Sequence, residues 1–449
     1  MKTLARHDRR IVLIPLALLL VASLPAMASQ ARTDHRQPRP NLVVTSYPLP
    51  ATTTVGAQVD APYISGNLQI DAAHDGDQPN MPYKPPLREA WSVRFTQDKV
   101  IYPEAPLIAD GMVFVTVVIQ GAWDTPVEGV QVTALSEATG QPVWGPVTLT
   151  GGGSTAYIAY GDGRLYVAYQ VASTGASGVT ALDGLTGGQL WSKAVVQHAY
   201  FRTPPVALGD LVYVFGNDPR GPEGAAIYAL DSATGRRIWA ADRVGDGGGG
   251  GFSAPTIGGG VASLTTGCAW TYAASQVSGH LLWRAAYNAM GGSEGTGSFY
   301  HGRIYSRFGC NGDPIFTART GQQLGTFSSG PMPAFDTNKG LSYAFFVNGS
   351  TLEGHDFTTN NLLWTFTGDG TLDSSPLVVD HVVYEGSSSG YLYAVNEKTG
   401  ALIQKLALGA GVPGMVENNL TPITGMAAGQ GLIVVPAGNT VVAFAGTQP

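Results

Sequence analysis

The chain has 449 residues, of which only 13% are charged and 60 are glycine. Charged residues make up about 25% of an average soluble protein, and a high glycine content is typical of many short strands joined by tight turns. With 9% aromatic residues the composition argues against a disordered chain, and a formal net charge of −7 argues against a broad nucleic-acid surface. We therefore expect no nucleic-acid partner.

The N-terminus predicts a cleavable export signal over residues 1–28. Basic residues, an apolar run and a small-residue cleavage site follow one another: Lys2, Arg6, Arg9 and Arg10, then residues 11–24, then Ala26-Met27-Ala28. The run is too short for a membrane span, and no later stretch reaches the roughly 18 apolar residues of a transmembrane helix. We expect a soluble, monomeric protein that is secreted or stays in the periplasm or cell envelope. Export by the general or the twin-arginine route is left open.

Residues 29–87 differ from the rest of the chain because they are rich in proline. We interpret them as an extended N-terminal arm with one strand at residues 63–70, which lies over the domain or is partly disordered. His74 and Asp75 form a candidate metal pair within this arm. A surface turn before the first strand is the favoured interpretation of these two residues.

From residue 88 onward the chain repeats itself, and a tryptophan marks the repeat. A turn with Gly or Asn four residues before the Trp recurs at Trp144, Trp191, Trp239, Trp283 and Trp364. The first four of these stand 44 to 48 residues apart, and 81 residues separate the last two. A degenerate repeat is therefore expected between them, with Gly325 in the Trp position, and one more follows with Gln404 there.

The residues of the repeat indicate a β-hairpin. In one copy a strand ends at Asp231, whose carboxylate can accept backbone N–H bonds from the turn, and Gly235 supplies the positive φ of a tight hairpin. The next strand carries Trp239. Because Trp recurs at one register, we expect it to pack into the seam against a neighbouring blade rather than to bind a ligand.

A second register gives the number of blades. A short turn precedes a β-rich strand eight times: Asp110-Gly111, Asp162-Gly163, Gly209-Asp210, Gly259-Gly260, His301-Gly302, Lys339-Gly340, Asp380-His381 and Gln430-Gly431. We interpret His301 and His381 as solvated turn residues. The last unit has three strands, whereas residues 90–95, with Trp91, form an outer strand without a blade. Residues 88–449 are therefore predicted to form one all-β domain, an eight-bladed β-propeller of four-stranded antiparallel blades, closed by pairing this N-terminal strand with the C-terminal strands.

These motifs resemble a known family. A strand followed by Ala-Leu-Asp, two residues, Thr-Gly, three residues and Trp resembles the repeat of the PQQ quinoprotein dehydrogenases and their non-catalytic relatives, which include the propeller lipoprotein of the outer-membrane β-barrel assembly machine. The best copies run from Ala181 to Trp191 and from Ala229 to Trp239. The resemblance implies the propeller with Trp91, Trp144, Trp191, Trp239, Trp283 and Trp364 as docking residues. It implies little about activity, because one fold hosts many functions.

The residues of a quinoprotein active site are not found. The family's dehydrogenases carry a disulfide between adjacent cysteines, carboxylate and amide ligands for Ca²⁺, and an Asp base, and no segment of this chain matches those motifs. No haem, serine-elbow, zinc-protease or phosphate-loop motif is present either. We assign no catalytic residue, metal or cofactor. PQQ with Ca²⁺ stays as the alternative.

The two cysteines, Cys268 and Cys310, occupy the same register in neighbouring repeats. An exported protein with two cysteines favours a disulfide, but equivalent positions on adjacent blades can lie too far apart for one. Both states are left open.

If a ligand binds, the loops that enter the innermost strands form its face, because they ring the channel. Their polar residues are Tyr102, Glu104, His198, Tyr200, Arg202, Glu294, Asp373, Glu417 and Asn418. An ordinary solvated rim is the favoured interpretation. The leading functional hypothesis is a non-catalytic scaffold that presents this face to a protein or glycan of the cell envelope. The alternative is a PQQ-dependent alcohol or sugar dehydrogenase.

Overall fold

The fold is taken from a computed structural model of the chain. It describes residues 43–46, 63–79, 81–95, 103–120, 127–149, 152–171, 177–196, 203–218, 224–241, 253–266, 270–286, 295–307, 312–414, 417 and 423–447. The predicted signal segment and both cysteines lie outside these residues. Within the described ranges, no helix has the length and hydropathy needed to cross a membrane.

The described residues form eight antiparallel blades with four strands each, to which two short arm strands are added. Blades 1 to 3 are, in chain order, β4(Leu107–Ala109), β5(Met112–Gln120), β6(Val127–Ser136) and β7(Pro142–Leu149); β8(Gly152–Gly161), β9(Arg164–Val171), β10(Ser177–Asp183) and β11(Gln189–Val196); β12(Val206–Leu208), β13(Leu211–Asp218), β14(Gly224–Asp231) and β15(Arg237–Ala240). Blades 4 and 5 are β16(Thr256–Gly258), β17(Val261–Thr266), β18(Trp270–Ser275) and β19(Leu281–Ala286); β20(Gly295–Tyr300), β21(Arg303–Arg307), β22(Asp313–Thr317) and β23(Gln323–Phe327).

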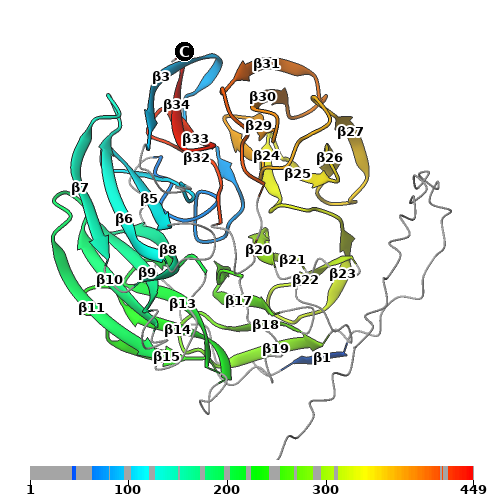
Figure 1. The fold of residues 1–449 in the computed structure, drawn as a ribbon. Helices are drawn as coiled ribbons and strands as arrows, with labels where there is room; N and C mark the ends of the chain where they lie inside the picture. Colours follow the sequence, from blue (N-terminus) through cyan, green and yellow to red (C-terminus); the bar gives the residue numbers. More distant parts are fainter. Residues whose placement is uncertain are drawn as a thin grey trace, which may run out of the picture. The chain divides into compact units, whose positions relative to one another are not determined.

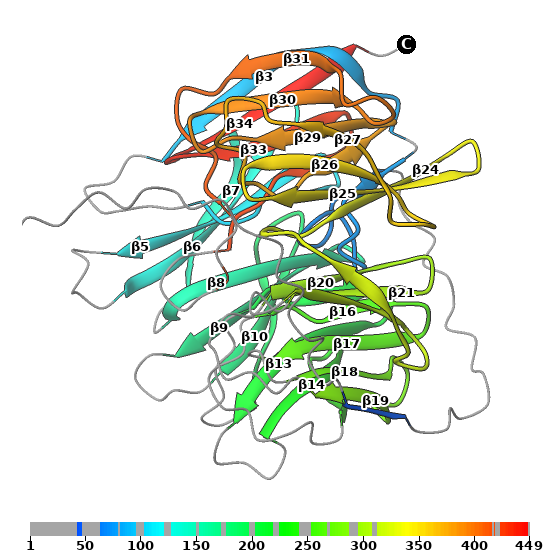
Figure 2. The ribbon, with the colours of Figure 1, turned by 90° about the vertical axis from the view of Figure 1, so that its right-hand side faces the viewer.

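The remaining blades continue the same order around the ring (Figures 1 and 2). Blade 6 is β24(Ala334–Asn338), β25(Leu341–Asn348), β26(Thr351–Asp356) and β27(Leu362–Phe366), and blade 7 is β28(Leu377–Val379), β29(Val382–Gly386), β30(Tyr391–Asn396) and β31(Leu402–Ala407). Blade 8 is β32(Ala427–Gly429), β33(Leu432–Ala437), β34(Thr440–Thr447) and β3(Lys84–Arg94). Of the arm strands, β1(Val43–Ser46) pairs with β19, and β2(Asp77–Gln78) pairs with β28.

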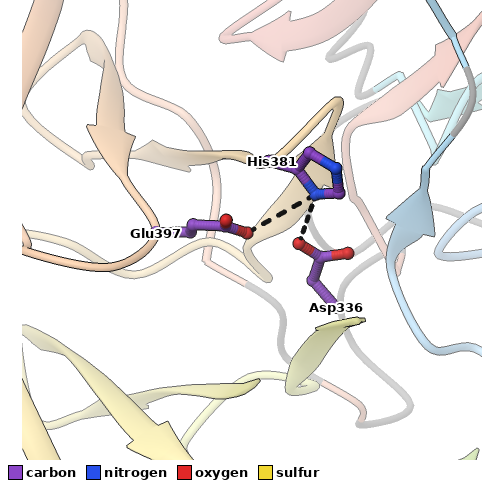
Figure 3. Close-up of side chains that lie close together, drawn as sticks. All are labelled: Asp336, His381 and Glu397. Carbon is purple, nitrogen blue, oxygen red and sulfur yellow. Dashed lines mark hydrogen bonds and ion pairs between the residues drawn. The ribbon is translucent and has the colours of Figure 1, made fainter. Parts of the chain in front are cut away.

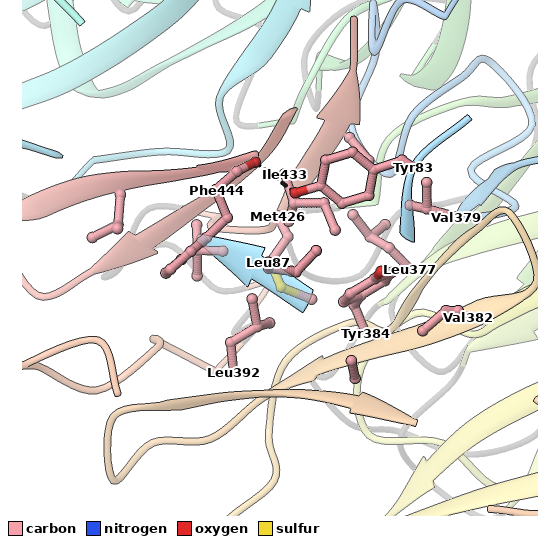
Figure 4. Packing of buried hydrophobic residues seen from close by; sticks show 14 of the residues in the cluster. Tyr83, Leu87, Leu377, Val379, Val382, Tyr384, Leu392, Met426, Ile433 and Phe444 are labelled. Atoms are coloured by element: carbon pink, nitrogen blue, oxygen red, sulfur yellow. Dashed lines mark hydrogen bonds between the residues drawn. The ribbon is translucent and has the colours of Figure 1, made fainter. Parts of the chain in front are cut away.

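The ring closes as predicted. Strand β3 pairs antiparallel with β34, with Ser92 opposite Val442 and Arg94 opposite Thr440. Eight separate hydrophobic clusters fill the eight seams between successive blades, including the seam between blade 8 and blade 1. Figure 4 shows the seam between blades 7 and 8, where Tyr83 and Leu87 pack with Tyr384 and Phe444. Among the described residues, each blade therefore packs both of its faces against its neighbours in the ring.

The predicted docking of the tryptophans is confirmed, and it explains the glycine of the turn. Each Trp packs on the turn glycine of the next blade; a Cβ at Gly321, for example, would lie 2.5 Å from the ring of Trp283. The indole Nε1 of five of the six donates to a backbone oxygen of that turn at 2.6–3.0 Å. Gly321 has a φ of 68°. The position therefore needs glycine for its backbone conformation and for the approach of the ring.

Two repeats lack the Trp, and they show what occupies the seam when no indole ring is present. Gly325 takes the Trp position in blade 5, and the matching turn position in blade 6 is Asn360 with a φ of 59°. No indole ring limits the space there, so a side chain is accepted. In blade 7, Gln404 takes the Trp position and holds the backbone of Leu87, accepting from its N at 2.7 Å and donating to its O at 3.0 Å.

Candidate functional site

The N-terminal arm runs inside the ring, which the sequence did not predict. The predicted strand over residues 63–70 is wrong, since only isolated bridges form there. Residues 63–78, called the axial segment below, bond instead to the first strand of each blade in turn. The amides of Ile257, Phe299, Phe335 and Val378, from blades 4 to 7, donate at 2.7–3.0 Å to the carbonyl oxygens of Ala72, Ala73, Asp75 and Gly76.

Blades 1, 2, 3 and 8 hold the other part of the axial segment. Ser65 exchanges two backbone hydrogen bonds with Ile108 of blade 1, and Gly66 O accepts from Tyr160 N of blade 2 at 2.6 Å. In blade 3 a side chain replaces the backbone: Asn67 donates to Ala207 O at 3.1 Å and accepts from Ala207 N at 2.8 Å. In blade 8, Tyr63 O accepts from Gln430 N, and the side chain of Gln78 donates to Ala428 O.

His74 is part of this packing and not of a surface turn, so that prediction is wrong. The imidazole is fully buried. Its Nδ1 lies 2.7 Å from Leu68 O and its Nε2 lies 3.0 Å from Pro255 O. Burial lowers the pKa of His74, against two hydrogen bonds that raise it. Because both ring nitrogens face carbonyl oxygens, the residue fixes the backbone of the axial segment and has no nitrogen available for a metal.

Apolar side chains fill the channel beside the axial segment. Leu68 is buried among Ala105, Tyr157, Met332 and Ile423, which lie in or directly before the first strands of blades 1, 2, 6 and 8. The five residues form one cluster of their own at the axis. The described part of the channel is therefore packed with the chain's own residues at this level.

Three of the nine predicted rim residues can be placed. Glu104 and Glu417 are buried, whereas Asp373 is exposed. The other six lie outside the described residues: Tyr102, His198, Tyr200, Arg202, Glu294 and Asn418. Glu104 accepts a hydrogen bond from Thr116 Oγ1 at 2.7 Å. The favoured solvated rim does not hold for these two buried glutamates.

Glu417 makes a buried ion pair with Arg307 across two elements. Its Oε2 lies 2.7 Å from Arg307 Nη1, and both side chains are more than 90% buried. Thr296 N donates to the other oxygen at 2.7 Å. Glu417 precedes blade 8, whereas Thr296 and Arg307 belong to blade 5, on strands β20 and β21. The pair therefore joins distant blades rather than presenting a charge to a ligand.

A cavity of about 750 Å³ lies at the end of the channel where the first strands of the blades turn into the second strands. It is bordered by turns that follow the first strands, at Gly258 and His301, and by Asp71, Asp75 and Asp77 of the axial segment. Burial, followed by the charge of Asp71, raises the pKa of Asp75 well above its ordinary value. Burial and the charges of Asp75 and Asp336 do the same for Asp77. Among the described residues that line the cavity, none is Lys or Arg.

A second group of titratable side chains lies at the seam of blades 6 and 7 (Figure 3). His381 Nδ1 lies 2.7 Å from Asp336 Oδ2 and 3.7 Å from Glu397 Oε2. Burial, together with the neighbouring carboxylate of Asp336, raises the pKa of Glu397 to about 8. His381 is thus not only a solvated turn residue. Sequence reasoning missed both carboxylates. Asp336 stands in no motif, and Glu397 stands in the turn of the last repeat, where it was interpreted only as part of that turn.

Glu385, on β29, is a buried carboxyl group in blade 7. The residue is fully buried, and its Oε1 accepts from Ser374 N at 3.1 Å and Ser374 Oγ at 2.9 Å. Burial, together with the charge of Asp373, raises the pKa of Glu385 well above its ordinary value. In the unfolded chain a glutamate has a pKa of about 4.3 and loses its proton above that pH. In the folded protein Glu385 therefore keeps its proton to a higher pH. The contribution of Glu385 to the free energy of unfolding is therefore largest at low pH and decreases as the pH rises.

We expect Glu385→Gln to resemble the protonated side chain and to remove this pH dependence. Urea unfolding at pH 4.0 should give similar free energies for the wild type and the variant. At pH 8.0 the variant should be the more stable, with the gap widening steadily between the two pH values. A gap of the opposite sign at pH 8.0 would show that Glu385 is ionised in the folded protein.

Comparison with known proteins places this architecture in a family. The family profile described as "Outer membrane protein assembly factor BamB" matches residues 128–406. The chain belongs to this family. The BamB match covers more than half of the chain and includes all of the docking tryptophans except Trp91. A search of curated proteins finds no match to the sequence.

Solved structures show the same fold at low sequence identity. The crystal structure of BamB from Moraxella catarrhalis is 17% identical, with a TM-score of 0.53 over 81% of this chain and 98% of that one. A europium-containing methanol dehydrogenase is 13% identical, with a TM-score of 0.63 over 86% and 98%. The quinohemoprotein alcohol dehydrogenase from Comamonas testosteroni is 15% identical, with a TM-score of 0.58 over 85% of this chain and 80% of that one. BamB and dehydrogenases thus share this fold, and the likeness shows the fold alone.

Proposed function

We propose that this BamB-family chain is an exported, non-catalytic scaffold that binds a protein partner at the cell envelope. The observation that carries the proposal is the path of the axial segment, which bonds to the first strand of all eight blades. The chain's own residues therefore fill the described part of the channel at the level of Leu68. The family's description as an outer-membrane protein assembly factor supports a protein rather than a glycan as the partner.

The residues around the open part of the channel do not fit PQQ. The quinone is a polycarboxylate, and binding it in a poorly solvated site requires positive charge. Asp71, Asp75 and Asp77 of the cavity are ligands that suit Ca²⁺. The described lining, however, has no Lys or Arg to pair with the carboxylates of the quinone. We derive no oxidation step through this cofactor.

Reconstitution separates the scaffold from the dehydrogenase. Purified protein is incubated with PQQ and Ca²⁺, gel-filtered, and assayed for quinone absorbance and for dye-linked oxidation of methanol, ethanol and glucose. A quinoprotein dehydrogenase treated in parallel serves as the control. We expect no retained quinone and no turnover. Retained quinone with turnover would reject the scaffold proposal.

The binding face is tested by charge reversal on either end of the ring. Asp373 is exposed in the loop that enters the first strand of blade 7. Lys339 is exposed in a turn at the opposite end. After envelope cross-linking, we expect Asp373→Lys to lose at least about fivefold in partner recovery and Lys339→Glu to keep it. Equal recovery for both, with unchanged melting temperatures, would place the partner elsewhere.

A further inference from the structure

The group at the seam of blades 6 and 7 has the chemistry of a metal site. It combines the imidazole of His381, the carboxylate of Asp336 on β24 and the carboxylate of Glu397 at the end of β30. One ligand atom from each lies within 4.8 Å of the other two. Ligands held about 2.1 Å from a tetrahedral zinc ion stand roughly 3.4 Å apart. The distances of 2.7 and 3.7 Å from His381 Nδ1 to the two oxygens lie on either side of that value.

Two buried oxygens in this group have no hydrogen-bond partner among the described residues. They are Asp336 Oδ1 and Glu397 Oε2. The side chain of Asp336 is 0% exposed and that of Glu397 is 2% exposed. Figure 3 shows the carboxylates of Asp336 and Glu397 directed toward His381. Buried carboxylate oxygens are costly to leave without a partner, so the arrangement calls for a cation.

The surrounding contacts hold the ligands in place. Asn338 Nδ2 donates to Glu397 Oε1, which leaves Oε2 directed into the group. Trp364 Nε1 donates to the backbone oxygen of Glu397 at 2.7 Å, so tryptophan docking fixes the turn that carries this carboxylate. Fixed ligand orientation of this kind strengthens metal sites in general. The side chain of His381 is 35% exposed and gives a cation access from solvent.

We propose that Asp336, His381 and Glu397 bind one divalent transition-metal cation of the zinc class, which joins blades 6 and 7. One imidazole nitrogen and two carboxylate oxygens suit Zn²⁺ or Mn²⁺, whereas Ca²⁺ takes six to eight oxygen ligands. The cation takes the place of the direct contact between His381 Nδ1 and Asp336 Oδ2. The site is distinct from the cavity, since none of its three ligands lines that cavity.

Calorimetric titration of the EDTA-treated mature chain with ZnCl₂ tests the proposal. We expect one equivalent to bind with a micromolar or lower Kd, Mn²⁺ to bind more weakly, and Ca²⁺ not to compete. Glu397→Gln and Asp336→Asn should each weaken zinc binding at least about tenfold. Zn²⁺ should also raise the melting temperature of the wild type and leave that of both variants unchanged.

A second histidine pair provides the matched control. His355 Nε2 lies 3.0 Å from Glu353 Oε2 in blade 6, and no third ligand joins them in the described residues. His355→Gln should keep full zinc binding. Melting curves without metal show that each variant is folded before it is titrated. Absence of saturable zinc binding in the wild type, or equal binding in folded Glu397→Gln, would overturn the proposal.

Discussion

A chain that begins at Met81, and so lacks the axial segment, should melt at least about 15 °C below the mature chain or fail to fold cooperatively. The deletion removes nine backbone hydrogen bonds between residues 63–78 and the blades, seven to first strands and two to the turns that follow them. Each contributes about 0.5–1.5 kcal/mol, and buried Leu68 and Ile70 add about 1.5–3 kcal/mol each. The sum is on the order of 10 kcal/mol, which is comparable with the whole stability of a typical domain.

Adding the missing segment back as a peptide tests whether the loss of stability comes from the axial segment itself. A synthetic peptide of residues 63–79 should bind the shortened chain and restore most of the melting temperature, because the first strands keep their unpaired N–H groups. A peptide with the same composition in scrambled order is the control. Equal melting temperatures for the shortened and mature chains would mean that the arm does not support the ring.

The second large effect is expected at the glycine under a docked tryptophan. Gly321→Ala places a Cβ 2.5 Å from the ring of Trp283 at a φ of 68°. Overpacking and backbone strain together should cost about 2–4 kcal/mol in the free energy of unfolding. Gly349→Ala is the matched control, since Gly349 has a φ of 62° and no atom within 4 Å of its added Cβ. The control should lose only about 1 kcal/mol.

A double-mutant cycle isolates the contact between the ring and the turn. Trp283 is 0% exposed, and Trp283→Ala alone should cost about 3–5 kcal/mol. When Trp283 is already Ala, Gly321→Ala should lower the free energy of unfolding only through backbone strain, by about as much as Gly349→Ala does. Urea unfolding measures all four proteins. Strict additivity of the two substitutions would contradict the docking contact.

The architecture was predictable because the repeat is local. Each unit carries its own turn and tryptophan, so period and register can be read from the chain without tertiary information. The closing strand could also be predicted from the sequence, because Trp91 stands at the repeat register and no blade precedes it in the chain. Even the degenerate repeat at Gly325 was located by spacing alone.

The channel and the site were not predictable, since both depend on contacts between distant residues. The axial segment has no hydrophobic period, because it bonds to a new blade at irregular steps of one to five residues and Asn67 uses its side chain where the other residues use the backbone. Likewise Asp336, His381 and Glu397 come from separate positions in two repeats. Only the docking of blade 6 on blade 7 brings them together.

Hydrogen exchange with mass spectrometry tests most directly that the arm occupies the channel. If it does, the amides of Ile257, Phe299, Phe335 and Val378, which donate to the axial segment, exchange only by global unfolding in the mature chain. They lose this protection in the chain that begins at Met81. Fast exchange of these amides in the mature chain, at the rate of a solvated tail, would contradict the account.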